Sequence, residues 1–164
     1  MKETLIKSVY FVALVLSMLV TGVFWGTWFT LTRSIETFSP AEFIHIGQTI
    51  ISNVAVPMRV IMPASIVFTI ISAWLYPRKR SVGFYFNIAA NILIIVTLLI
   101  TLLVLVPIDN QIRSWTVSTI PPQFTSLRDT WQSFHSLRTV TSLTSFASLA
   151  LSVILSPSRR SSGT

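Results

Sequence analysis

The chain has 164 residues, of which 52% are hydrophobic and only 10% are charged, and its mean hydropathy is +0.73. A soluble globular domain carries about 25% charged residues, and a disordered chain has low hydrophobicity, so the composition excludes both classes and indicates an integral membrane protein. The absence of cysteine excludes disulfides, thiolate metal sites and cysteine nucleophiles. In a membrane protein the net charge of +7 is a guide to topology, and we expect no nucleic-acid partner.

Four apolar stretches account for most of the chain, over residues 8–31, 54–76, 82–106 and 136–155. A bilayer core of ~30 Å needs ~20 helical residues to span it, so the first three stretches are long enough. The fourth is long enough if its helix begins within residues 126–134. Backbone groups in lipid must be hydrogen-bonded within the chain. Together with short polar connections, this predicts an all-α fold, a transmembrane antiparallel four-helix bundle in a single domain over residues 1–164.

The basic residues predict how the bundle is oriented. With four spans, both termini and the connection between the second and third spans share one side. That side would hold seven basic residues: Lys2, Lys7, Arg78, Lys79, Arg80, Arg159 and Arg160. The other side would hold five: Arg33, Arg59, Arg113, Arg128 and Arg138. Basic residues are enriched on the cytoplasmic side, so we expect both termini in the cytoplasm.

The opposite side would hold four of the five acidic residues and both histidines. These residues fall in the two longest expected connections, residues 32–53 and 107–137, and we expect any chemistry there. Within the spans, Gly22 and Gly26 form a G-x-x-x-G pattern, which we expect to pack against the protein's own helices. Pro57 and Pro63 are expected to kink the second helix.

A helix start is predicted in the first of these connections. Ser39 followed by Pro40 and Glu42 forms a capping box, and Glu42, His45 and Gln48 then recur on one helical face. This face either points to water or contributes His45 and Gln48 to a substrate site. A third interpretation joins Glu42 and His45 with His135 in a metal site. No H-x-H or H-x-x-x-H pattern supports it, so we expect no bound metal.

A stripe of functional side chains is predicted on the last helix. Pro121 and Pro122 end any preceding helix, and Arg128, Trp131, His135 and Arg138 then follow at spacings of three and four residues, on one helical face. Polar groups at a membrane edge are costly and usually have a partner or a function. In a purely structural interpretation, the arginine side chains extend to the membrane interface and Trp131 anchors the helix there. His135 then forms a hydrogen bond with Asp109 or Asn110.

The same part of the chain resembles a known family. The segment D-N-Q-I-R-S-W at residues 109–115 and the run R-D-T-W-Q-S-F-H-S-L-R-T at residues 128–139 are similar to the signature of anthrone-oxygenase-like integral membrane proteins. The matching residues are Asn110, Trp115, Trp131, His135, Arg138 and Thr139. The resemblance implies a four-span protein. It also implies oxidation of an anthrone to an anthraquinone with O₂, without a metal or flavin cofactor.

Anthrone oxidation would need three things from these residues. His135, with an ordinary pKa of ~6.5, would be the catalytic base that removes the acidic benzylic proton. Arg138 would stabilise the oxyanion that forms. Trp115 and Trp131 would stack on a flat substrate, and Asn110 would orient the histidine or donate to a carbonyl group.

The sequence also leaves a second class open. In this alternative the protein is a non-enzymatic four-helix membrane protein that binds a lipophile or stabilises a partner protein. The partners expected in either case are the lipid bilayer and a lipophilic aromatic molecule, and nothing in the sequence defines an oligomeric state.

Overall fold

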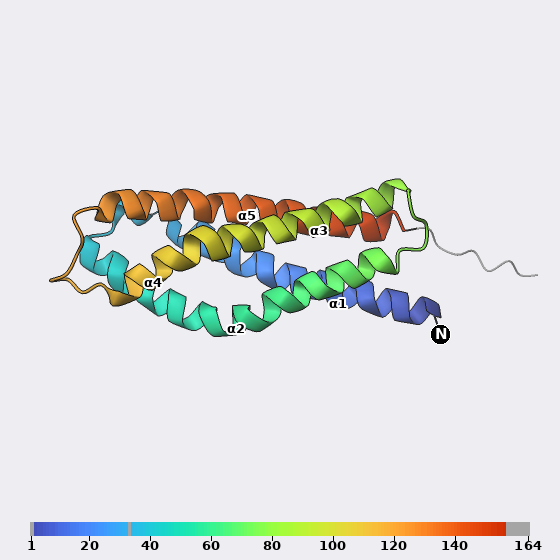
Figure 1. Ribbon diagram of the computed structural model, residues 1–164, viewed down its shortest axis with the longest axis horizontal. Helices are drawn as coiled ribbons and strands as arrows, with labels where there is room; N and C mark the ends of the chain where they lie inside the picture. Colours follow the sequence, from blue (N-terminus) through green and yellow to red (C-terminus); the bar gives the residue numbers. More distant parts are fainter. Residues whose placement is uncertain (1, 33, 157–164) are drawn as a thin grey trace, which may run out of the picture.

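A computed structural model describes residues 2–32 and 34–156, which form four long helical segments packed as an antiparallel bundle (Figure 1). Arg33, Arg159 and Arg160, three of the basic residues in the orientation argument, lie outside the described residues. The helices of the bundle are α1 (Lys2–Thr27), α2 (Pro40–Trp74), α3 (Val82–Ile100), α4 (Val106–Ser114) and α5 (Phe124–Ile154).

Short π-helical or 3₁₀ segments lie in two of the connections, between α1 and α2 and between α3 and α4. The π-helical segment η1 (Trp28–Thr32) extends α1, and the 3₁₀ turn η2 (Ile35–Thr37) leads towards α2. A second π-helical segment, η3 (Thr101–Leu105), joins α3 to α4 in one continuous rod. Four segments are long and apolar enough to cross a membrane: Glu3–Thr32, Pro40–Trp74, Val82–Ser114 and Phe124–Ile154. The prediction of an all-α transmembrane bundle is confirmed.

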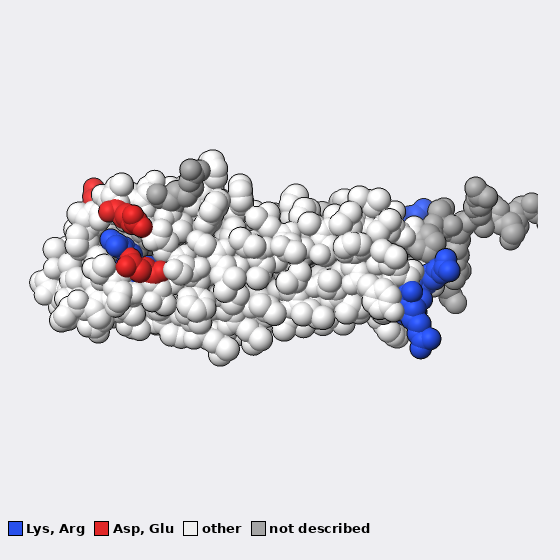
Figure 2. Space-filling model, turned by 90° about the horizontal axis from the view of Figure 1, so that it is seen from above, with Lys and Arg blue, Asp and Glu red and all other residues white. Residues whose placement is uncertain are grey.

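The helices close into a ring, because α1 packs against α2 and α5, and α3 also packs against α2 and α5. The first residues of α1, the connection 75–81 and the end of α5 lie at one end (Figure 1), which we call the basic end after Lys7, Arg78, Lys79 and Arg80. We call the opposite end, which contains residues 34–39 and 115–123, the aromatic end. In Figure 2 charged side chains gather at the two ends and leave a long uncharged surface between them.

Two helices extend further than the apolar stretches indicate. The helix α2 begins at Pro40, so most of the expected connection 32–53 is helical. The capping box explains this start, since Ser39 Oγ accepts a hydrogen bond from the Glu42 amide at 3.4 Å and the Glu42 carboxylate accepts one from the Ser39 amide at 2.8 Å. On the third rod the helix continues past Asp109 to Ser114, because Pro107 occupies the first turn of α4, where proline is tolerated.

The proline and glycine expectations have different outcomes. The helix α2 continues through Pro57 and Pro63 and changes direction midway along its length (Figure 1), as the prolines predict. The expectation for Gly22 and Gly26 is wrong: a Cβ atom at either position would meet no described atom within 4 Å. The helix α1 instead buries other positions: Ala13, Ser17, Val20, Thr21 and Phe24.

Small polar residues bring α3 and α5 together. Thr139, Ser142, Ser145, Ser148 and Ser152 are buried along one face of α5, at spacings of three or four residues. Ser145 Oγ donates to the Ala90 carbonyl at 2.8 Å. Small residues at a membrane helix interface allow the backbones to approach closely, and their hydroxyls find carbonyl partners. This packing fixes the position of α5 and therefore of the side chains at its aromatic end.

Candidate active site

The aromatic end of α5 presents Trp131, His135 and Arg138 to the interior of the bundle. The indole of Trp131 stacks on the His135 ring, with centroids 5.0 Å apart and planes 8° from parallel. The Arg138 guanidinium bonds His135 Nδ1. His135 is only 1% exposed. The predicted stripe is therefore present for these three residues, whereas Arg128 lies towards the surface and pairs with Asp129 at 2.9 Å.

The contact between Arg138 and His135 determines which ring nitrogen carries the proton. A guanidinium has only N–H donors, so Nδ1 of His135 must accept. A neutral His135 in this arrangement therefore carries its hydrogen on Nε2, which is buried and has no hydrogen-bond partner among the described residues. The Nε atom of Arg138 is also buried without a partner there. Buried polar atoms nearly always have a hydrogen-bond partner, so these two nitrogen atoms are donors inside the bundle that could bind a ligand.

The third helical rod contributes an acid to the site. Trp131 Nε1 donates to Asp109 Oδ1 at 2.9 Å, so the indole is held between α4 and α5. The structural interpretation of the sequence expected Asp109 or Asn110 to bond His135, but Asp109 bonds Trp131 instead, and Asn110 is exposed. Neighbouring residues on a helix point about 100° apart, which follows from 3.6 residues per turn, so only one of the two can face the site.

The helix α1 covers the site from the remaining side. The Arg138 guanidinium carbon lies 4.1 Å from the centre of the Phe24 ring, a cation–π contact. The Phe24 carbonyl accepts a bond from Thr139 Oγ1 at 3.4 Å. Asp109 and Arg138 interact electrostatically. A buried guanidinium needs such compensation, and here an acid and an aromatic face supply it.

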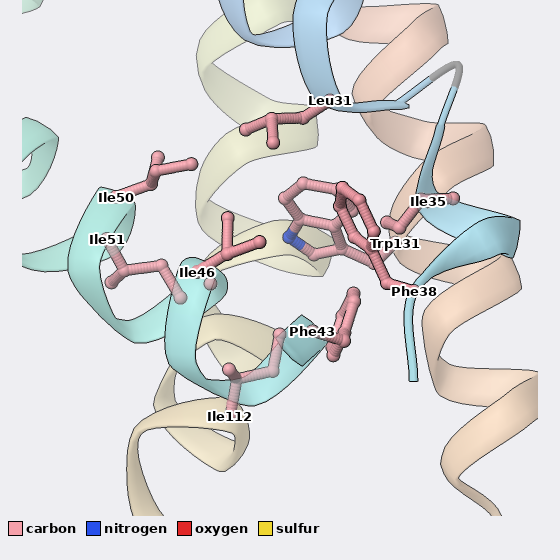
Figure 3. Close-up of a pocket in the computed structure, with 10 residues that line it drawn as sticks. Leu31, Ile35, Phe38, Phe43, Ile46, Ile50, Ile51, Ile112 and Trp131 are labelled. Carbon is pink, nitrogen blue, oxygen red and sulfur yellow. The ribbon is translucent and has the colours of Figure 1, made fainter. Parts of the chain in front are cut away.

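An apolar pocket adjoins the site; it is partly open to the surroundings, and its empty space of about 370 Å³ includes that open part. Its lining residues are all apolar or glycine: Leu31, Ile35, Phe38, Phe43, Ile46, Gly47, Ile50, Ile51, Ile112 and Trp131. Figure 3 shows the Trp131 indole among these side chains, with residues of α2 on one side and those of η2 and the following segment on the other. Trp131 is therefore shared by the pocket and by the His135 site, whereas His135 and Arg138 do not line the pocket.

The other predicted substrate-binding residues lie outside the pocket lining. His45 is exposed on α2. The Gln48 amide donates to the carbonyls of Ile112 at 3.0 Å and Trp115 at 2.9 Å. Trp115 is buried against Phe124, with ring centroids 6.0 Å apart. A role for these residues in substrate binding stays a prediction.

The metal interpretation is not supported by the geometry. Within the described parts of the chain, no three or more His, Asp or Glu side chains gather closely enough to hold a metal ion. The Glu42 carboxylate bonds Ser39, His45 points outwards on α2, and His135 is buried within the bundle. The three residues that this interpretation combined are therefore not brought together.

Comparison with known families decides the family of the chain. A family model described as anthrone oxygenase matches residues 52–148, more than half of the sequence. The chain belongs to the anthrone oxygenase family. No curated protein and no solved structure matches it. The part that matches the anthrone oxygenase model contains Asp109, Trp131, His135 and Arg138, so the four interacting side chains all lie inside it.

Two parts of the site were missed by sequence reasoning. From the sequence, Asp109 is expected only as a partner for His135, although a lone acid near arginines at the end of an apolar span is itself a signal. The pocket walls from η1, η2 and the start of α2 carry no polar marker and could not be singled out. They also precede the segment that matches the anthrone oxygenase model, which begins at residue 52.

Proposed function

We propose that this protein oxidises a lipophilic aromatic, anthrone-like compound with O₂, with the buried pair His135 and Arg138 as its catalytic centre. The observation that carries the proposal is the position of this pair directly behind Trp131, the wall of an all-apolar pocket. Family membership supports the class of reaction, since the matching model is described as anthrone oxygenase.

The proposed chemistry converts a methylene between two aromatic rings into a carbonyl, R₂CH₂ + O₂ → R₂C=O + H₂O. Loss of one benzylic proton gives an anion whose charge is shared with the carbonyl oxygen of the substrate. This anion gives its electrons to O₂ and forms a C–O bond, producing a hydroperoxide after protonation. Loss of water from the hydroperoxide then leaves the second carbonyl. The substrate anion itself reduces O₂, so the proposal includes no resident cofactor.

These reaction steps require a base for the benzylic proton and donors for the anionic oxygen, and the site supplies both. Arg138 and the Nε2–H of His135 are buried donors that stabilise the anionic oxygen of the substrate, an effect that is strong where water is excluded. Proton removal needs a free lone pair. The lone pair of His135 Nδ1 becomes available when the Arg138 guanidinium moves from Nδ1 to the substrate oxygen. One movement then provides both the base and the counter-charge.

The test measures O₂ uptake by the purified protein with an anthrone, above the rate in protein-free detergent. We expect His135→Ala to lower the catalysed rate by about 10²–10⁴-fold, the usual contribution of a general base. Arg138→Gln is expected to lower it by about 10²–10³-fold, as for removal of an oxyanion donor. Ser133→Ala, an exposed change on the same helix, is the control and should keep the wild-type rate.

Two outcomes would contradict this proposal. One is a rate that His135→Ala leaves unchanged. The other is a wild-type rate no faster than the protein-free reaction. If the protein then still binds the anthrone, with a change in tryptophan fluorescence, the non-enzymatic lipophile-binding alternative is favoured.

We also propose that both termini face the cytoplasm and that the site opens on the other side of the membrane. At the basic end, the described basic side chains are Lys7, Arg78, Lys79 and Arg80, and they support this orientation under the positive-inside rule. The described residues near the aromatic end include four acids: Glu36, Glu42, Asp109 and Asp129.

A further inference from the structure

Trp131 separates the apolar pocket from the catalytic pair. Its indole lines the pocket and also stacks on His135, at 5.0 Å between ring centroids. His135 is 1% exposed and does not line the pocket. A molecule in the pocket therefore meets the indole and cannot reach the imidazole while the indole stays in place.

Two contacts hold the indole in this position. Its Nε1–H donates to Asp109 Oδ1 at 2.9 Å, and Phe43 packs edge-on against the ring, with centroids 6.3 Å apart and planes 89° from parallel. The hydrogen bond joins α5 to α4, and Phe43 belongs to α2, so three helices fix the ring. Of these two contacts, the one with Asp109 is polar and directional.

The side chains next to the indole have donors without acceptors. His135 Nε2 and Arg138 Nε are buried without partners among the described residues. Such atoms are costly unless a ligand or water completes their hydrogen bonds. The face of the imidazole that would meet a flat aromatic molecule is the one that the indole covers, at 8° from parallel.

We propose that Trp131 is a gate between the apolar pocket and His135, and that Asp109 is the positioning residue that holds the gate closed. A planar aromatic substrate enters by displacing the indole and takes the place of the indole beside His135 and Arg138. The gate thereby selects flat rings over branched or saturated lipophiles. This selection rests on the proposed function, whereas the closed gate itself does not.

The test measures the rate at which diethyl pyrocarbonate modifies His135. The chain has two histidines, so in a His45→Ala background His135 is the only one, and mass spectrometry follows its carbethoxylation directly. No substrate is present. We expect slow modification in the background protein. Asp109→Ala removes the acceptor and Trp131→Phe removes the donor of the hydrogen bond between these two side chains. Each variant should raise the rate of His135 modification about tenfold or more, because loss of a hydrogen bond to a charged group shifts the balance between the closed and open positions of the ring by that order.

Matched variants separate gating from loss of the fold. Asp109→Asn retains an acceptor oxygen and should give an intermediate rate. Gln111→Ala, an exposed change on α4, should not alter the rate. Each variant is labelled well below its own unfolding midpoint in detergent. If Asp109→Ala does not fold, Trp131→Phe decides the test, since it retains an aromatic ring in the same position.

The outcomes distinguish the gate from the proposed function. An unchanged labelling rate in folded Trp131→Phe overturns the gate, even if anthrone turnover depends on His135. Faster labelling in a protein that does not oxidise anthrones leaves the gate standing and rejects the proposed function. Anthraquinone, a flat product analogue, should protect His135 in the open variants, and an equal-sized saturated lipophile should not. Equal protection by both would overturn the selection of flat rings.

Discussion

Gln48 shows how a residue that the sequence places beside a substrate can be committed to the fold. Its amide nitrogen lies within hydrogen-bond distance of three carbonyls at the end of α4: those of Ile112 at 3.0 Å, Arg113 at 3.4 Å and Trp115 at 2.9 Å. The last carbonyls of a helix have no partner within that helix, so a side chain from α2 supplies one. The predicted binding role and this structural role lead to different experiments.

We expect Gln48→Ala to lower the free energy of unfolding by about 1–3 kcal/mol, because partly buried carbonyls would lose their donor. The measurement is chemical unfolding in detergent. Gln111→Ala, which changes an exposed amide on α4, is the control, and we expect a change within about 0.5 kcal/mol. Unchanged stability combined with weaker anthrone binding would instead support the role predicted from the sequence.

The side chains on α5 also show how far local spacing predicts a site. Spacings of three and four residues correctly place Trp131, His135 and Arg138 on one face. The spacing does not identify Asp109 as the partner of Trp131, because that contact depends on how two helices far apart in sequence are aligned. It also does not show that the Arg138 guanidinium bonds His135 Nδ1. This contact places the hydrogen of a neutral His135 on Nε2 and occupies the lone pair that the proposed base needs.

At the scale of helices, hydropathy locates the apolar centre of each span but not its ends. The helix α2 starts at Pro40 because Ser39 and Glu42 cap it, although the apolar stretch begins at residue 54. Helix caps and spans are separate sequence signals, and nothing local shows that they belong to one helix. The helix α5 begins at Phe124, two residues before the expected range 126–134, although Pro121 and Pro122 correctly indicate that no continuous helix enters it from the preceding segment.

The interface between α3 and α5 provides a prediction at this scale. Ser145 is buried against Ala90, which has no exposed surface, so a larger side chain has no room. We expect Ser145→Leu to lower stability by about 1–3 kcal/mol through overpacking. Ser145→Ala removes only the hydrogen bond and should cost about 0.6 kcal/mol, the average for such bonds in membrane helices. Thermal unfolding in detergent compares the two, and equal stability of both variants would contradict close packing here.

At the scale of the whole molecule, the face shown in Figure 2 carries its charged side chains at the two ends of the bundle and is uncharged between them, whereas Arg59 is exposed midway along α2. This distribution follows from the cost of charge in hydrocarbon, and it is the part of the architecture that composition predicts best. The prediction that remains is which end faces the cytoplasm. The natural chain has no cysteine, so single cysteines can report on it without background.

We expect a membrane-impermeant maleimide to label Ser118→Cys but not Thr4→Cys in intact cells, with both labelled after permeabilisation. Thr4 is exposed at the basic end, and Ser118 is exposed at the aromatic end. Seven basic residues on the side of the termini against five on the other are the reason for this expectation. Labelling of Thr4→Cys alone in intact cells would reverse the orientation.

The most direct test of the central claim is oxidation of an anthrone under ¹⁸O₂ by the protein reconstituted in vesicles, with the quinone analysed by mass spectrometry. We predict labelled quinone at a rate well above that of protein-free vesicles, with the new carbonyl oxygen derived from O₂. The rate should fall to the protein-free level in His135→Ala and stay unchanged in Ser133→Ala. Labelled quinone that forms equally fast with His135→Ala, or no faster than in protein-free vesicles, would contradict the proposed centre.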